Sequence, residues 1–329
     1  MCFYAEEINM RARTLVLFLL ACPGIAEAQV YPTKPIRVIV PSTAGGSVDK
    51  LARVVGEELQ GRVGQAVVID NRPGAGGTIG AQTAATSAPD GYTLMMGTLA
   101  ALATNPSFEK LRYDPVRDFT AISLVGKQDM MLTVGASSPI KSVAELIRLA
   151  KQNPNSVTYA SAGRGTGTHL AGALFSQMSG APMLHVGYKG LVPGMTDVIG
   201  GRVTCMFPSI ASGLPMVRAG KVRLLAVTGK KRFAILPQVP TVSEAGVRGF
   251  EVTSWYGLVA PSKTPRPIVD QLNKEIVQIL KVSKLQDMFL EDGMELVPTT
   301  PAAFNVLIKD EIARWKKLIQ TAGLEKVEQ

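Results

Sequence analysis

The feature that most constrains the fold is a unit that occurs three times: a short hydrophobic strand, a glycine-rich turn and then a helix. The turns lie at residues 42–46, 74–78 and 162–168. Before each turn stands a run of strand-forming residues, and after it the apolar residues take helical spacing. Alternation of this kind is typical of an α/β protein with a mainly parallel sheet and helices on both faces.

The same patterns predict the remaining elements. Strands are expected at residues 36–40, 67–69, 93–96, 131–134, 157–160, 203–207 and 223–227. Helices are expected at residues 48–59, 78–86, 143–151, 169–179, 267–280 and 302–319. Ser142, with Glu145 three residues later, forms a capping box that marks the start of one helix.

The glycine-rich turns are candidate anion sites. In open α/β sheets, ligands bind at the carboxyl ends of strands. The start of a helix offers free N–H groups and a partial positive charge, and glycine lets an anion approach the backbone. Hydroxyl donors are available from Ser42, Thr43, Thr166 and Thr168. Two interpretations stay open from the residues alone: anion capture, or glycine that serves only to make tight turns.

Enzyme chemistry finds little support in the sequence. Neither Gly74-x-Gly76 nor 163–167 completes a dinucleotide-binding fingerprint, and no Gly-Lys-Ser/Thr phosphate loop or Gly-x-Ser-x-Gly elbow occurs. The two histidines, His169 and His185, and the one cysteine beyond the N-terminal segment, Cys205, do not form a usual zinc pattern. We therefore expect a protein that is not an enzyme and needs no metal or cofactor.

The N-terminal segment resembles a secretory signal. Arg11 and Arg13 precede an apolar run at 15–22, and the small residues of 26–28 suit cleavage before Gln29. The run is shorter than the ~20 residues of a membrane-spanning helix. Met10 is the expected true start. An alternative is a lipoprotein signal in which Cys22 is modified and anchors the protein.

Length and charge set further bounds. A chain of 329 residues with 46% hydrophobic residues is long enough for about two domains. Loss of residues 1–28 removes two Arg and three Glu, so that 33 basic and 23 acidic residues remain and the net charge is +10. A positive field attracts anions. The basic residues are scattered rather than interleaved with aromatic ones, which argues against a nucleic-acid partner.

A series of motifs resembles one known family along essentially the whole chain after the signal segment. The motifs include Tyr31-Pro32-x-Lys34-Pro35, Pro41-x-x-x-Gly45-Gly46-x-x-Asp49, Asn71-Arg72-Pro73-Gly74-Ala75-Gly76-Gly77, Pro89-Asp90-Gly91-Tyr92, Gly165-Thr166-x-x-His169-Leu170-Ala171-Gly172 and Trp255-x-Gly257-Leu258-x-Ala260-Pro261. As an ordered set they are similar to the Bug-type substrate-binding proteins of tripartite tricarboxylate transporters.

The resemblance implies a type II periplasmic-binding-protein fold, with two α/β lobes, a hinge and a ligand cleft. The first lobe would comprise residues 29–128 plus 252–329, and the second residues 129–251. It further implies a periplasmic protein, monomeric by default, that binds a small mono- or dicarboxylic acid and delivers it to a membrane permease. An alternative role is a ligand sensor that reports to a signalling partner.

The resemblance also implies the ligand-binding residues. They are Thr43, Ala44, Gly45, Gly46 and Thr98 from the first lobe, and Gly163, Gly165, Thr166, His169 and Ser209 from the second. We expect bulky substitution of Gly45 or Gly165 to abolish binding.

Two departures from the family pattern affect the ligand. The family commonly has Phe-Ala-Pro where Ser42-Thr43-Ala44 stands, which changes the shape and polarity of the pocket. Pro208 replaces an Asp that would pair with a ligand ammonium group. This replacement suggests the hypothesis that the ligand lacks an amine.

Overall fold

The computed structural model describes residues 31–154 and 156–321. The signal segment expected at residues 1–28, with Met10 and Cys22, lies outside the described residues. The chain divides after Thr33, and the helices and strands of the described residues lie in the part from Lys34 onward.

Six strands form the first sheet. Their order is β11 (Met294–Leu296), β4 (Phe119–Asp129), β10 (Thr253–Pro261), β3 (Thr93–Thr98), β1 (Ile36–Val40) and β2 (Val67–Asn71). β1 pairs parallel with β2 and β3, whereas β10 runs antiparallel to both β3 and β4.

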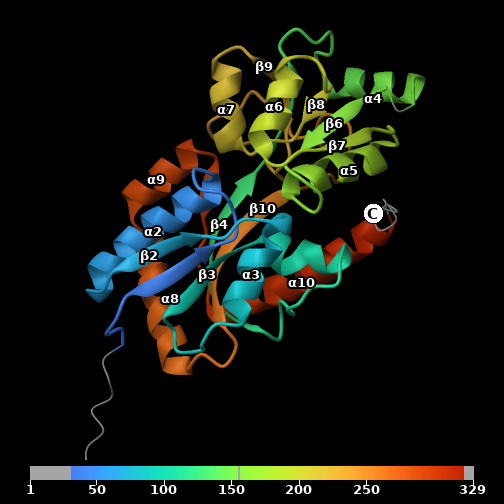
Figure 1. The fold of residues 1–329 in the computed structure, drawn as a ribbon. Helices are drawn as coiled ribbons and strands as arrows, with labels where there is room; N and C mark the ends of the chain where they lie inside the picture. The colour runs from blue at the N-terminus through green and yellow to red at the C-terminus, as the bar shows by residue number, and fades with distance from the viewer. Residues whose placement is uncertain (1–30, 155, 322–329) are drawn as a thin grey trace, which may run out of the picture. The chain divides into compact units, whose positions relative to one another are not determined.

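Helices cover both faces of this sheet. They are α2 (Ser47–Val63), α3 (Thr78–Ala85), α8 (Arg266–Leu280), α9 (Ser283–Glu291) and α10 (Pro301–Thr321). α2 and α8 pack against each other on one face, and α3 and α10 lie on the other (Figure 1). The alternation of side chains along a strand explains this arrangement. Ile39 in β1 packs in one buried cluster with Ala81 of α3 and Phe304 of α10.

Five strands form the second sheet, in the order β7 (Leu184–Gly187), β6 (Thr158–Ser161), β8 (Cys205–Met206), β5 (Met131–Gly135) and β9 (Val222–Val227). Its helices are α4 (Val143–Gln152), α5 (Gly167–Ser179), α6 (Leu191–Ile199) and α7 (Ile210–Arg218). Tyr159 and Cys205 pack with α4 and α5, while the next residues, Ala160 and Met206, pack with α6. Cys205 is fully buried, and burial raises the pKa of its thiol to about 12.

The α/β class is confirmed, but the expectation of a mainly parallel sheet is wrong. The chain passes from β4 directly into β5 of the second sheet and returns through β10. A returning strand that pairs with the outgoing one must run against it, and β10 pairs antiparallel with β4 over its whole length. The antiparallel pairs thus arise where the chain crosses between the two sheets.

Candidate functional site

Two of the glycine-rich turns lie between a strand and the helix that follows it. One connects β1 to α2, and the other connects β6 to α5. In both, glycines hold the left-handed backbone that other residues rarely adopt: φ is +84° at Gly45 and +76° at Gly165. The sequence therefore fixes the shape of each turn through its glycines.

A side chain on the first turn of α2 braces the first of these turns. The carboxylate of Asp49, 3% exposed, accepts hydrogen bonds from the N–H of Gly45 at 2.9 Å, from Asn71 Nδ2 at 2.9 Å and from Arg53 Nε at 3.0 Å. Burial opposes ionisation of Asp49, but the bonds from Arg53, Gly45 and Asn71 outweigh it and lower the pKa. The turn is thus attached to its own helix by a buried charge.

His169 braces the second turn in the same way. Its Nδ1 accepts a hydrogen bond from the N–H of Gly165 at 3.2 Å, again four residues earlier in the chain. The His169 ring is 5% exposed and lies 4.2 Å from that of His185, centroid to centroid. The Nε2 of His185 lies 2.6 Å from Ser161 Oγ, which accepts from the N–H of Gly163. Both histidines therefore hold the turn, directly or through Ser161.

Both imidazoles are neutral at pH 7. Burial, and after it His185 and Arg164, lowers the pKa of His169 to about 3. Burial and Arg164 lower the pKa of His185 to about 4. An unfolded histidine has a pKa of about 6.5, so the unfolded chain takes up these protons first as the pH falls.

We expect acid to destabilise the protein through this pair. The stabilisation that depends on the two neutral histidines is fully present above about pH 6.5. It is lost as the pH falls from there towards 4, by up to about 1.4 kcal/mol per pH unit for each histidine. Urea unfolding between pH 7.5 and 4.5 measures the slope. The variants His169→Gln and His185→Gln should flatten it, and a slope equal to that of the wild type in both would contradict this account.

Two adjoining cavities open beside these turns. The larger has a volume of ≈ 860 Å³ and is lined by residues of both turns, of 73–77 and of 98–109. The smaller has a volume of ≈ 210 Å³. Both are lined by Ser42, Thr43, Val48, Thr166, Gly167, Ser254 and Tyr256. Thr104 Oγ1 donates to the carbonyl of Gly165 at 3.0 Å, which links the segment 98–109 to the turn before α5.

Most of the expected ligand residues lie at these cavities. Thr43 and Thr166 line both. Thr98, Gly163 and Gly165 line the larger cavity, and Gly46 and Ser209 line the smaller one. Ala44, Gly45 and His169 line neither of them.

The N–H groups of the turn glycines have partners inside the protein. Gly45 donates to Asp49, Gly163 to Ser161 and Gly165 to His169. The N–H groups left for a ligand are therefore those of the first helical turns, where no acceptor precedes them in the helix.

Helices α2 and α5 begin at the cavities without a side-chain cap. Neither Gly46, at the start of α2, nor Thr166, at the start of α5, accepts a capping hydrogen bond. By contrast, Ser209 caps α7 and Ser142 caps α4. An uncapped helix start offers N–H donors and a positive partial charge to an anion. The two helices that open on the cavities are thus suited to hold a negatively charged group.

The sequence did not indicate several lining residues. Gln128 of β4 and Ser254 and Tyr256 of β10 line the smaller cavity, and Arg164 and Phe108 line the larger one, with the guanidinium carbon 5.4 Å from the ring centroid. The residues on β4 and β10 were missed because the sequence patterns do not predict these two strands. Once the strands are known, alternate residues on them are candidates for the cavity wall.

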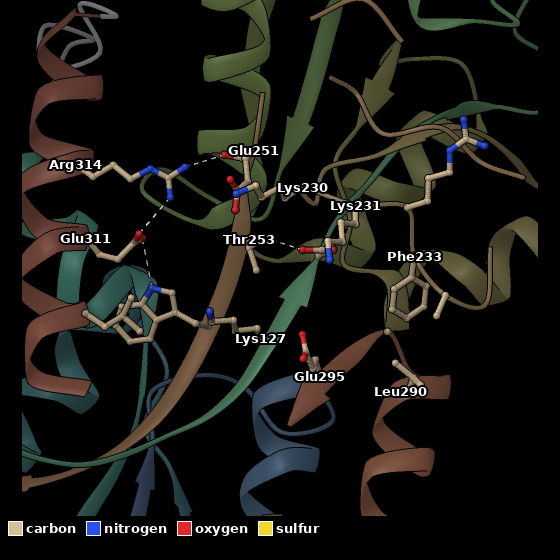
Figure 2. A pocket seen from close by; sticks show the side chains of 16 residues that line it. Lys127, Lys230, Lys231, Phe233, Glu251, Thr253, Leu290, Glu295, Glu311 and Arg314 are labelled. Atoms are coloured by element: carbon tan, nitrogen blue, oxygen red, sulfur yellow. Dashed lines mark hydrogen bonds and ion pairs between the residues drawn. The ribbon is translucent and has the colours of Figure 1, made fainter. Parts of the chain in front are cut away.

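A third cavity, of ≈ 510 Å³, lies on the opposite face of β4 and β10. Gln128 and Ser254 line the smaller ligand-side cavity, whereas their chain neighbours Lys127 and Thr253 line the third one. Successive side chains of a strand point to opposite faces, so the two strands separate the cavities. Figure 2 shows the third cavity from close by.

Side chains of both charges line the third cavity. They are Lys127, Lys230, Lys231, Arg232 and Arg314 on the basic side and Asp129, Glu251, Glu295 and Glu311 on the acidic side, most of which are labelled in Figure 2. Burial raises the pKa of Asp129 against the hydrogen bond from Thr253, and the nearby Glu251 and Glu295 raise it further. An entering carboxylate would meet these like charges. The adjoining pair of cavities on the other face, where two uncapped helices begin, is the candidate ligand site.

Comparison with known proteins identifies the family to which the chain belongs. The family model described as "Tripartite tricarboxylate transporter family receptor" matches residues 51–324. An R. palustris protein solved with adipate is 38% identical, with a TM-score of 0.85 over 89% of this chain and 98% of that one. MatC from Rhodopseudomonas palustris, solved with bound malate, is 31% identical, with a TM-score of 0.81 over 88% and 100%.

The periplasmic binding protein BugD is 35% identical, with a TM-score of 0.81 over 89% of this chain and 99% of that one. These neighbours share the two-lobe fold of periplasmic binding proteins and are ligand-binding proteins rather than enzymes. Within the described part of the chain, no helix is long and apolar enough to cross a membrane. The chain belongs to the Bug-type receptor family of tripartite tricarboxylate transporters.

Proposed function

We propose that this receptor captures a small carboxylic acid in the adjoining cavities and delivers it to a tripartite tricarboxylate-type membrane permease. The observation that carries the proposal is the pair of uncapped helix starts, of α2 and α5, at a cavity lined by no acidic side chain among the described residues. The neighbours solved with adipate and with malate support the same class of ligand.

The mechanism we propose is closure of two lobes around the acid. Residues 29–128 plus 252–329 would form one lobe and residues 129–251 the other, so that the start of α2 and the start of α5 belong to different lobes. A carboxylate that accepts hydrogen bonds from both would stabilise the closed form over the open one. Charge-assisted bonds of this kind are about twice as strong as neutral ones.

Export belongs to the proposal. Residues 1–28 would act as a signal peptide, with anchoring through Cys22 as the alternative, and the mature protein would work in the periplasm as a monomer. A small organic acid and the permease subunits are the proposed partners.

Thermal unfolding against a panel of acids tests the function. The panel contains mono-, di- and tricarboxylates, amino acids and aromatic acids, with a diol and a diamide of matched length as controls. A ligand at 100 times its Kd adds about 2.7 kcal/mol to stability, which raises the Tm by at least about 2 °C. We expect a shift with one group of acids and none with the neutral controls. Equal shifts with acid and diol, or no shift with any acid, would contradict the proposal.

A further inference from the structure

Gln128 presents a buried donor to the smaller cavity. It stands on β4 and is 1% exposed. Its Oε1 accepts a hydrogen bond from the hydroxyl of Tyr256 on β10, at 3.1 Å. Its Nε2 is buried and finds no partner among the described residues. A buried donor without a partner is unfavourable, so a native protein that keeps one calls for an explanation.

Tyr256 fixes which end of the amide faces the cavity. Burial raises the pKa of Tyr256 to about 12, against a hydrogen bond with Ser254, so the hydroxyl keeps its proton. That proton is donated to the amide oxygen of Gln128. The oxygen is therefore occupied, and the NH₂ end remains for the cavity.

The rest of the lining suits an acceptor and not a cation. The described residues around the smaller cavity include no Asp, Glu, Lys or Arg. They supply many hydroxyl groups, from Ser42, Thr43, Ser47, Thr166, Thr168, Ser209, Ser212, Ser254 and Tyr256. The starts of α2 and α5 add positive partial charge. An ammonium group here could bond to hydroxyl oxygens, but it would lie at two positive helix starts without a carboxylate as counter-charge.

We propose that Gln128 is a specificity-determining residue: its Nε2 donates a hydrogen bond to an oxygen of the bound acid in the smaller cavity, and Tyr256 positions the amide for this contact. The cavity thereby selects a carboxylate, carbonyl or hydroxyl oxygen and rejects an ammonium group. The inference rests on the proposed function and adds to it the ligand class, an acid without an amine at this end.

Two substitutions of Gln128 test the contact by calorimetric titration with the acid that binds the wild type best. Gln128→Glu has the same shape but replaces the donor by a carboxylate, and we expect at least about 100-fold weaker binding. Gln128→Met removes the donor without adding charge, and we expect binding about 10-fold weaker. Tyr256→Phe, which removes only the positioning hydroxyl, should weaken binding less than Gln128→Met does.

Gln177→Met is the matched control. The Oε1 of Gln177, on α5, is also buried and has no partner in the described part of the chain, but Gln177 lines neither ligand cavity. The control should therefore leave the Kd unchanged. The ratio of affinities for succinate and for aspartate, its amino analogue, gives a second readout. We expect Gln128→Glu to lower this preference, which a general loss of folding would not do.

The outcomes distinguish a failure of this inference from a failure of the proposed function. If the wild type binds no acid of the panel, the proposed function and the role of Gln128 both fail. If the wild type binds an acid and Gln128→Met binds it as well as Gln177→Met does, only the role of Gln128 fails. If Gln128→Glu does not fold, Gln128→Met decides alone.

Discussion

Asp49→Ala is expected to lower the free energy of unfolding by about 2–4 kcal/mol, because removal of a buried charged acceptor leaves its donors without partners. Three donors meet at this carboxylate: the N–H of Gly45, Asn71 Nδ2 and Arg53 Nε. The turn before α2 is thereby released, so we also expect ligand binding to weaken by at least about tenfold. Urea unfolding and calorimetric titration measure the two effects.

Acid pH and the variant Arg53→Ala provide two controls for Asp49→Ala. The pKa of Asp49 is lowered on folding, so its contribution is present above the unfolded value of about 3.9 and is lost as the pH falls below it. The difference in the free energy of unfolding between Asp49→Ala and the wild type should therefore become smaller in acid. Arg53, whose side chain is 52% exposed, should matter less, and Arg53→Ala should cost less than about 1 kcal/mol. A loss in Asp49→Ala no larger than in Arg53→Ala would contradict the assigned role.

Local sequence signals predicted much of the fold. The strand at 36–40 was expected from a β-branched run that ends at Pro41, and β1 has these bounds. The start of α4 was expected from a capping box, and Ser142 Oγ accepts from the N–H of Glu145 at 3.2 Å. The Glu145 side chain differs from the motif, since it accepts from the N–H of Lys141. Such signals are readable because they depend on neighbours in the chain.

β4 and β10 were not predicted, for a physical reason. Eight of the eleven residues of β4 are buried, six of them in succession, so the alternation that marks a half-exposed strand is missing there. The strand also contains Gly126, Lys127 and Gln128, which are poor strand signals. Its pairing with β10 joins residues far apart in the chain, as the contact between Gln128 and Tyr256 does over 128 positions.

In the candidate site too, the features that depend on neighbours in the chain were predicted, and those that depend on distant contacts were not. The turns around Gly45 and Gly165 were found because glycine, strand and helix stand in sequence order. The roles within the turns were not readable, because they depend on side-chain geometry: His169 was expected to face the ligand, and it holds the N–H of Gly165. Gln128 and Ser254 reach the cavity through a pairing of two distant strands. Sequence therefore located the two turns, and the fold supplied the wall between them.

The second large effect is expected at Gly165. The residue has φ +76°, and an added Cβ would lie 2.8 Å from Asn105 Oδ1 and 3.5 Å from Phe108 Cδ2. A valine would strain the backbone by about 1–3 kcal/mol and also push the turn away from Asn105. Because this turn lines the larger cavity and leads into α5, we expect Gly165→Val to weaken binding by at least about 100-fold, which corresponds to about 2.7 kcal/mol. Calorimetric titration measures the loss, and far-ultraviolet circular dichroism checks that the fold remains.

Gly45 offers a control with the same backbone strain and no clash. Its φ is +84°, close to that of Gly165, but an added Cβ would meet no atom within 4 Å, and the residue lines neither ligand cavity. The sequence alone predicts that bulky substitution at either glycine abolishes binding, whereas the geometry predicts unequal effects. Gly45→Ala and Gly165→Ala should each lose about 1 kcal/mol of stability from strain, but only the second should lose most of its affinity. Equal affinities in these two variants would show that the turn before α5 does not form the wall of the ligand site.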